Sequence, residues 1–149
     1  RIARLDEAIT WLDQHLSGDG PRVRWEKLGP AIAHDRLQAA YFYLVQALFA
    51  YNRCWRPWRN REMSSLLELY WLPHNFAERA LSALGPASPD YVGYLGRVEC
   101  LRGLFQETTD RLVADGDYGK DVIGEAFIRS HDEPGRAWRD RRLPPRARP

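Results

Sequence analysis

The sequence predicts an all-α protein, an antiparallel bundle of about five to six helices. Apolar residues recur every three or four positions along almost the whole chain, as they do on one face of a helix. No stretch alternates apolar and polar residues for long enough to indicate a β-strand. Short clusters of Gly, Pro, Ser and Asp separate the periodic segments, and helices joined by such short loops pack as antiparallel neighbours.

The first two predicted helices contain the most apolar sequence. Residues 2–16 repeat apolar side chains in steps of three and four, whereas the pattern around residues 22–25 does not indicate one conformation. Pro30 suits the first turn of a second helix, which extends to about Asn52. The wide apolar arc of this second helix predicts that neighbours surround it in the bundle. Its apolar residues are Leu37, Tyr41, Phe42, Leu44, Val45, Leu48, Phe49 and Tyr51.

Two shorter helices are predicted next. Asn60 suits the N-cap of the first of them. Its apolar residues are Met63, Leu66, Leu67 and Tyr70. Pro73 is expected to open the other, which ends before Gly85.

The carboxy-terminal part predicts one long helix and one short one. Ser88-Pro89-Asp90 combines an N-cap, a proline for the first turn and an acid favoured by the helix dipole. In the helix that follows, Glu107 and Arg111 have the spacing of an i,i+4 ion pair. Asp115-Gly116-Asp117 is expected to be a helix-stopping turn, and a last amphipathic segment spans residues 122–128.

Length and charge predict one folded domain, residues 1–133, followed by a flexible tail, residues 134–149. A chain of 149 residues is long enough to bury a substantial core. The tail contains six Arg against one Asp, so the rest of the chain carries a net negative charge. A basic end of this kind, rich in Arg and Pro, is typical of disorder.

Several classes of protein are disfavoured by the composition. The two cysteines form no disulfide framework, which is typical of a reducing, cytoplasmic location. No signal peptide is recognisable, and the most apolar stretch, residues 37–51, is shorter than the ~20 residues of a membrane span. We therefore expect no membrane association.

Motifs of known enzymes are not found in this chain. GxSxG, HExxH, GxxxxGK[ST] and GxGxxG do not occur, and the four His show no pairing at metal-ligand spacing. Asp115-Gly116-Asp117 does not continue as a calcium loop, because Lys120 stands where that loop requires glycine. We predict no catalytic residue and no metal ligand.

One segment concentrates the chemistry of ligand binding. Residues 53–61, the Arg/Trp segment, read Arg-Cys-Trp-Arg-Pro-Trp-Arg-Asn-Arg. Guanidinium groups match phosphate oxygens, and indole faces suit planar rings. A phosphate-bearing small molecule is therefore the expected ligand, since a nine-residue patch on an acidic body is small for a nucleic-acid track. Two alternatives stay open: the segment docks on another protein, or its indoles are core and its guanidiniums are a solvated helix junction.

The stretch Gln46-Ala-Leu-Phe-Ala-Tyr-Asn-Arg-Cys-Trp-Arg-Pro resembles a motif of a known family. That family is the uncharacterised helical domain that follows nucleotidyltransferase-fold domains and is distantly similar to the helical half of kanamycin nucleotidyltransferase. The resemblance covers roughly residues 25 to 115. The matching residues are Leu48, Phe49, Ala50, Asn52, Arg53, Trp55 and Pro57.

The resemblance implies a substrate-binding or accessory role. In that family a preceding catalytic domain would hold a Gly-Ser turn and metal-binding acids, and the helical domain would close one wall of the cleft. These 149 residues lack that half, and because they begin at Arg1 directly in a helix we expect a fragment or a separately studied domain. No cofactor is expected on this chain; Mg²⁺ with ATP or GTP would require a catalytic domain, which is the expected partner unless the chain forms a homo-oligomer.

The resemblance also completes the set of candidate ligand-binding residues. Asn52 and Arg53 would face the cleft, although both could equally cap the central helix. The candidates are Asn52, Arg53, Trp55, Arg56, Trp58, Arg59 and Arg61.

Overall fold

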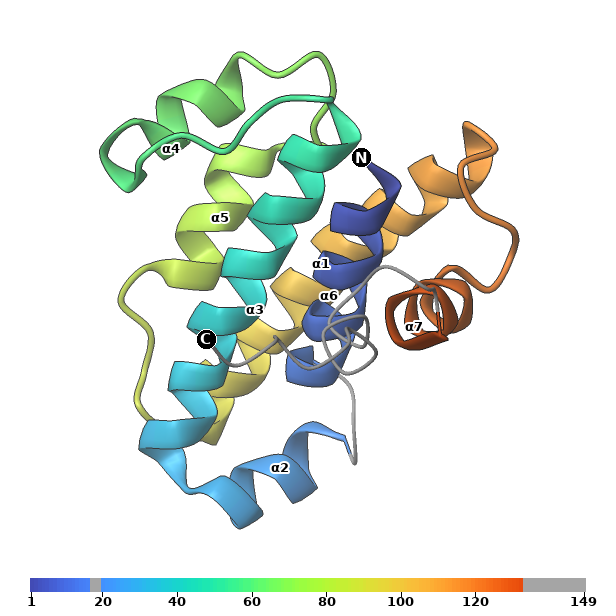
Figure 1. Cartoon of the computed structure of the whole chain (residues 1–149). Helices are drawn as coiled ribbons and strands as arrows, with labels where there is room; N and C mark the ends of the chain where they lie inside the picture. The colour runs from blue at the N-terminus through green and yellow to red at the C-terminus, as the bar shows by residue number, and fades with distance from the viewer. Residues whose placement is uncertain (17–19, 133–149) are drawn as a thin grey trace, which may run out of the picture.

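The computed structural model describes residues 1–16 and 20–132, which contain seven helices and no strand (Figure 1). The helices are α1 (Ile2–Leu16), α2 (Pro21–Leu28), α3 (Pro30–Tyr51), α4 (Arg59–Leu67), α5 (Phe76–Leu84), α6 (Tyr91–Ala114) and α7 (Val122–Asp132). The predicted all-α class is confirmed. The additional helix is α2, formed by the segment whose pattern indicated no single conformation. The predicted flexible tail, residues 134–149, lies outside the described residues.

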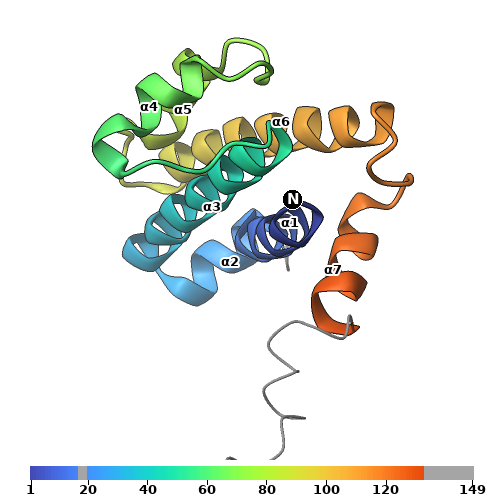
Figure 2. The ribbon, with the colours of Figure 1, turned by 45° about the horizontal axis from the view of Figure 1, so that its top comes forward.

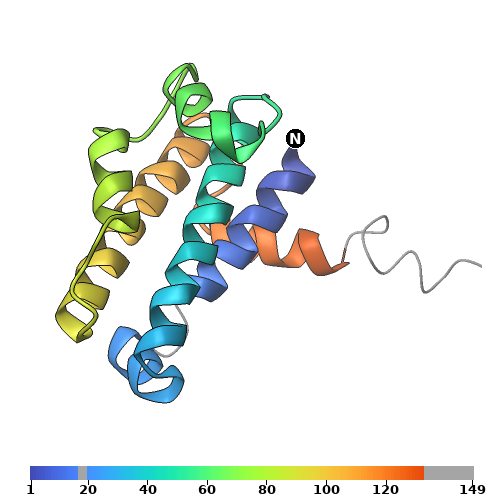
Figure 3. The ribbon, with the colours of Figure 1, turned by 90° about the vertical axis from the view of Figure 1, so that its left-hand side faces the viewer.

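The helix α3 lies at the centre of the bundle. It packs against α1, which runs antiparallel to it, and against α6, while α5 lies antiparallel along α6 (Figure 1). The helix α7 packs mainly on α1 and crosses it steeply (Figures 2 and 3). The helices α4 and α2 lie at opposite ends of α3. The loop after α3 therefore lies beside the start of α1.

The core is centred on α3, as its wide apolar arc predicts. Its completely buried side chains include those of Leu37, Leu44 and Leu48. Phe42 is an exception, because it is 41% exposed on the outer side of α3 and packs under an arginine instead of in the core. Among the described residues, no helix has both the length and the apolar character needed to cross a membrane.

The segment after α3 departs from the predicted one. The helix α4 begins after Trp58 instead of Asn60, and it ends at Leu67, before the predicted Tyr70. Of the apolar residues of α4 only Leu66 is buried, so this helix contributes a single apolar side chain to the core. The next helix starts at Phe76, three residues later than Pro73 predicts.

The starts of α5 and α6, and the ion pairs on the surface of α6, differ from those that the sequence predicts. Asn75 precedes α5 in the left-handed conformation, which asparagine tolerates, and so ends the loop. The N-cap of α6 is Asp90, whose carboxylate accepts a hydrogen bond from the Gly93 N–H at 2.9 Å. Pro89 therefore precedes the helix and does not lie in its first turn. The predicted Glu107–Arg111 pair was wrong: Glu107 bonds the Arg79 guanidinium of α5, and Arg111 pairs with Asp115.

Candidate ligand-binding site

The end of α3 is tied to the loop before α5 by the side-chain amide of Asn52. Its Nδ2 donates to the Leu48 carbonyl at 2.8 Å and to the Trp71 carbonyl at 2.9 Å, and its Oδ1 accepts from the Trp71 N–H at 2.9 Å. All three of these partners of the Asn52 side chain are backbone groups. Asn52 therefore positions the site, in agreement with the capping alternative that the sequence left open.

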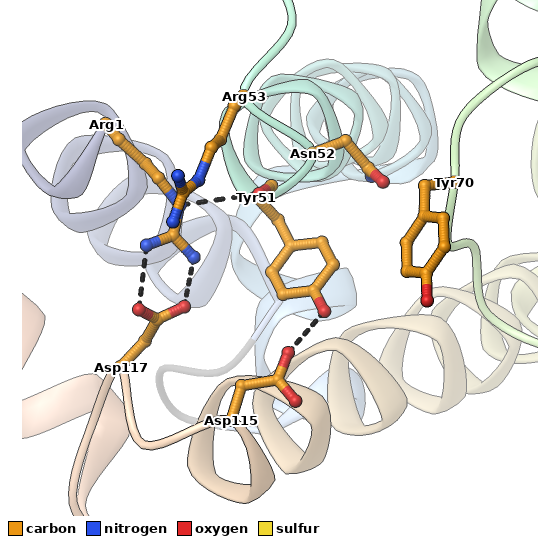
Figure 4. A pocket seen from close by; sticks show the side chains of 7 residues that line it. All are labelled: Arg1, Tyr51, Asn52, Arg53, Tyr70, Asp115 and Asp117. Carbon is orange, nitrogen blue, oxygen red and sulfur yellow. Dashed lines mark hydrogen bonds and ion pairs between the residues drawn. The ribbon is translucent and has the colours of Figure 1, made fainter.

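Arg53 turns the chain away from α3. Its φ of 60° lies in the left-handed region, and the Cys54 N–H donates to the Phe49 carbonyl at 2.9 Å, which closes the end of the helix. A left-handed residue other than glycine costs about 1 kcal/mol, so the fold must hold this turn in place. The turn directs the exposed Arg53 side chain toward Arg1 (Figure 4).

Arg56 is engaged within the protein. Its Nε donates to the Glu62 carboxylate at 2.6 Å, and the guanidinium carbon lies 3.9 Å from the centroid of the Phe42 ring. The side chain of Glu62 is 8% exposed and that of Arg56 18%. This ion pair joins the loop to α4, and Arg56 is the candidate least available to a ligand.

The remaining three candidates at the start of α4 face solvent. Trp58 is 90% exposed, and Arg59 and Arg61 are also exposed. Within the described residues, neither of these two guanidiniums forms a salt bridge. Trp58 and Arg59 line a shallow pocket of about 420 Å³ together with the Arg56–Glu62 pair and Phe42.

A second pocket brings together residues that are distant in sequence. Its volume is about 380 Å³, and it lies where α1 begins and α3 ends. The guanidinium carbon of Arg4 lies 3.5 Å from the centroid of the Trp55 indole. Three arginines and an indole line this pocket, and no carboxylate does. The lining residues are Arg1, Arg4, Ala50, Arg53, Cys54 and Trp55.

Sequence reasoning did not identify Arg1 and Arg4 as site residues. Arg1 directly precedes α1, and Arg4 lies in its first turn. That they meet Arg53 depends on the antiparallel packing of α1 against α3, for which the local sequence carries no signal.

The neighbouring pocket is shared with the acidic turn after α6. Its volume is about 340 Å³, and Arg1 and Arg53 belong to both pockets. The Arg1 Nη1 donates to Asp117 at 2.7 Å, and Arg1 holds the pKa of the Asp117 carboxyl below its usual value, with a smaller contribution from Arg53 (Figure 4). This carboxylate is therefore already neutralised. The lining residues are Arg1, Tyr51, Asn52, Arg53, Tyr70, Asp115 and Asp117.

The second carboxylate of this turn is also engaged. Tyr51 donates its hydroxyl hydrogen to Asp115, and the Arg111 Nε donates to the same hydroxyl oxygen at 2.8 Å. Burial, together with the Asp115 hydrogen bond, raises the pKa of Tyr51. As predicted, residues 115–117 form the turn that ends α6, with Gly116 at a φ of 76°. The described residues contain no group of three or more His, Cys, Asp or Glu side chains that could hold a metal.

The fold and the site define an all-α bundle with an Arg- and Trp-lined surface pocket between its first helix and the loop after its central helix. No protein-family model matches this chain, and no curated protein and no solved structure matches it.

Proposed function

We propose that this protein is a helical binding module that holds a phosphate-bearing ligand with a planar ring in the pocket of Arg1, Arg4, Arg53 and Trp55. One observation carries the proposal: three guanidinium groups and an indole line a single pocket of about 380 Å³ without a carboxylate. Guanidiniums bind phosphate oxygens with paired N–H donors, and such charge-assisted hydrogen bonds are stronger than neutral ones.

The arrangement of the pocket assigns a role to each side chain. Arg53 and Arg4 would hold the phosphate, because the third guanidinium of the pocket, that of Arg1, is already bonded to Asp117. Trp55 is 79% exposed, with Arg4 over its ring, so an indole face remains available for the ring of the ligand. The chain would contribute by fixing the orientation of the ligand.

The motif that contains Asn52 and Arg53 supplies the wider context. Its resemblance to the helical domains of nucleotidyltransferase-type proteins supports a substrate-facing module that works beside a catalytic domain, in the cytoplasm. Mg²⁺ with ATP or GTP would then enter with that domain. Asn52 would shape the pocket through its bonds to Leu48 and Trp71, whereas Arg53 would contact the ligand.

Calorimetric titration with ATP or GTP and magnesium tests the proposal. We expect Arg4→Ala/Arg53→Ala to weaken binding about tenfold or more, because each lost charge-assisted hydrogen bond is worth about 1.5–3 kcal/mol. The control Arg59→Ala/Arg61→Ala removes the same charge outside the pocket and should change the affinity by about twofold at most. A wild-type protein that binds neither nucleotide, or equal losses in both double variants, would contradict the proposal.

A second candidate function is docking, in which α4 binds a second copy of the chain. The supporting observation is that α4 and the residues flanking it expose large apolar side chains: Leu67 is 55% exposed, Trp58, which precedes the helix, 90%, and Tyr70, which follows it, 93%. Interfaces concentrate their binding energy in Trp, Tyr and Arg. Light scattering should then give a mass that rises with concentration in the wild type and not in Trp58→Ala. A constant monomer mass for the wild type would exclude this function.

A further inference from the structure

Arg97, in the first turns of α6, is a buried cation without a counter-charge. It is 6% exposed; its Nε donates to the Ala83 carbonyl at the end of α5 at 2.6 Å, and its Nη1 lies 2.8 Å from the His34 Nδ1. Its Nη2 is buried and has no hydrogen-bond partner. No carboxylate of the described residues forms an ion pair with it.

Such a group is costly for the folded protein. A guanidinium does not lose its proton in proteins, and a buried charge normally has a partner of opposite sign. Burial lowers the pKa of Arg97, which expresses the same cost. If Arg97 served only to bond the Ala83 carbonyl at the end of α5, its Nε–H would be sufficient. The burial of its Nη2 without a partner would then have no explanation.

His34 adds a second unsatisfied donor beside the first. Its Nδ1 faces an Arg97 N–H and must accept, so its Nε2 carries the hydrogen. This Nε2 is buried and also lacks a partner. Each of the two side chains thus leaves one buried N–H donor without an acceptor, and the uncompensated positive charge of Arg97 points to an anion beside its Nη2.

Two aromatic rings contact His34. The Trp25 ring of α2 lies 5.7 Å from the ring of His34 and 5.2 Å from that of Tyr94, which is 1% exposed. Arg24 and Arg102 act on the Tyr94 hydroxyl as nearby positive charges. The surroundings are therefore apolar and electropositive, which strengthens attraction for an anion.

The helix α2 has the features of a cover for this cluster. None of its eight residues is buried, and glycines in the left-handed region flank it: Gly20 with a φ of 93° and Gly29 with a φ of 77°. A Cβ at either position would meet nothing within 4 Å, so the space beside both glycines is open. The polar attachment of α2 to α1 is the bond from the Arg24 guanidinium to the His15 carbonyl. Trp25 is the α2 residue that packs over His34 and Tyr94.

We propose that Arg97 and His34 form a buried site for a small inorganic anion and that α2 is its lid, hinged at Gly20 and Gly29. The buried donors exclude a macromolecular ligand. This site lies near the end of the bundle where α3 begins, whereas the Arg/Trp pocket lies at the end of α3 (Figure 1). It is thus independent of the function proposed above.

Thermal unfolding and tryptophan fluorescence of the full chain, titrated with sodium phosphate and with sodium chloride at matched ionic strength, test the site. We expect one of these anions to raise the unfolding temperature by about 3 °C at about ten times its Kd. The accompanying fluorescence change should disappear in Trp25→Phe. No response to either anion would overturn the proposal.

Two variants separate this site from the other pocket. Arg97→Met should abolish the response to the anion, and Arg4→Ala/Arg53→Ala should retain it. An equal response in Arg97→Met and wild type would overturn the site. If Arg97→Met does not fold, bromide-soaked wild-type crystals decide, because an anomalous peak beside the Arg97 Nη2 is expected and ordered water there would contradict the proposal.

Hydrogen exchange tests the lid. Amides of α2 should exchange quickly without the anion and become protected when it is bound, and Arg97→Met should show no such protection. Unchanged exchange in α2 of the wild type at saturating anion would overturn the assignment of α2 as a lid.

Discussion

Asp6 and Arg129 join the first helix to the last. Asp6 has no exposed surface, and Arg129 donates to both of its carboxylate oxygens, from Nη2 at 3.0 Å and from Nε at 3.1 Å. The Tyr118 hydroxyl donates to the same carboxylate at 2.6 Å. Since α7 packs mainly on α1, this network is its main polar attachment to the bundle.

Asp6→Asn should destabilise the protein by about 3 kcal/mol, because removing one partner of a buried ion pair leaves the other charge uncompensated. Urea unfolding measures this. The matched control is Glu26→Gln, whose partner Arg22 is 63% exposed, and it should cost less than about 1 kcal/mol. Equal losses in the two variants would show that α7 is not held by this pair.

Tyr41→Phe should stabilise the protein by about 1 kcal/mol. The Tyr41 hydroxyl is buried without a partner, and burial is the main cause that raises its pKa to about 12. Tyr118→Phe is the comparison, since it removes a hydroxyl that donates to Asp6 and should destabilise by a similar amount. The prediction fails if thermal unfolding gives both variants the same sign.

Two glycines of α6 should respond oppositely to alanine. A Cβ at Gly93 would lie 1.9 Å from the Ser88 carbonyl oxygen, whereas one at Gly96 would meet nothing within 4 Å. Gly93→Ala should therefore cost about 2 kcal/mol, because the backbone must move. Gly96→Ala should stabilise by about 0.5–1 kcal/mol through helix propensity. Calorimetry of both variants checks this, and a stabilising Gly93→Ala would contradict the packing at the start of α6.

The contribution of Asp117 should depend on pH. Arg1 lowers the pKa of this carboxyl in the folded state, so the unfolded state binds the proton more tightly. The stabilisation is then fully present above the unfolded pKa of about 3.9 and is lost as the pH falls through the lower folded value. Urea unfolding of wild type and Asp117→Asn should differ from pH 7 to about 4, and the difference should shrink as the pH falls further toward the folded pKa. A difference that persists in acid, or that survives in an Arg1→Gln background, would refute this pair.

The site was predictable only in part. The Arg/Trp segment indicated where charge and indoles gather, and Arg53 and Trp55 do line a pocket. The segment could not indicate that Arg56 is taken by Glu62, because that pairing depends on how α4 folds back. It also could not indicate Arg4, which reaches Trp55 from a helix some fifty residues earlier in the chain.

The sequence by itself determined the helical class, most helix positions and the central place of α3. The physical reason is that apolar periodicity, prolines and capping residues act within about four residues along the chain. Only the tertiary structure decided which charges stay free. Glu107 lies one helical turn from Arg111 on α6, yet it forms an ion pair with Arg79 of α5. The reason is that ion pairs depend on how whole helices pack, and the entire core determines that packing.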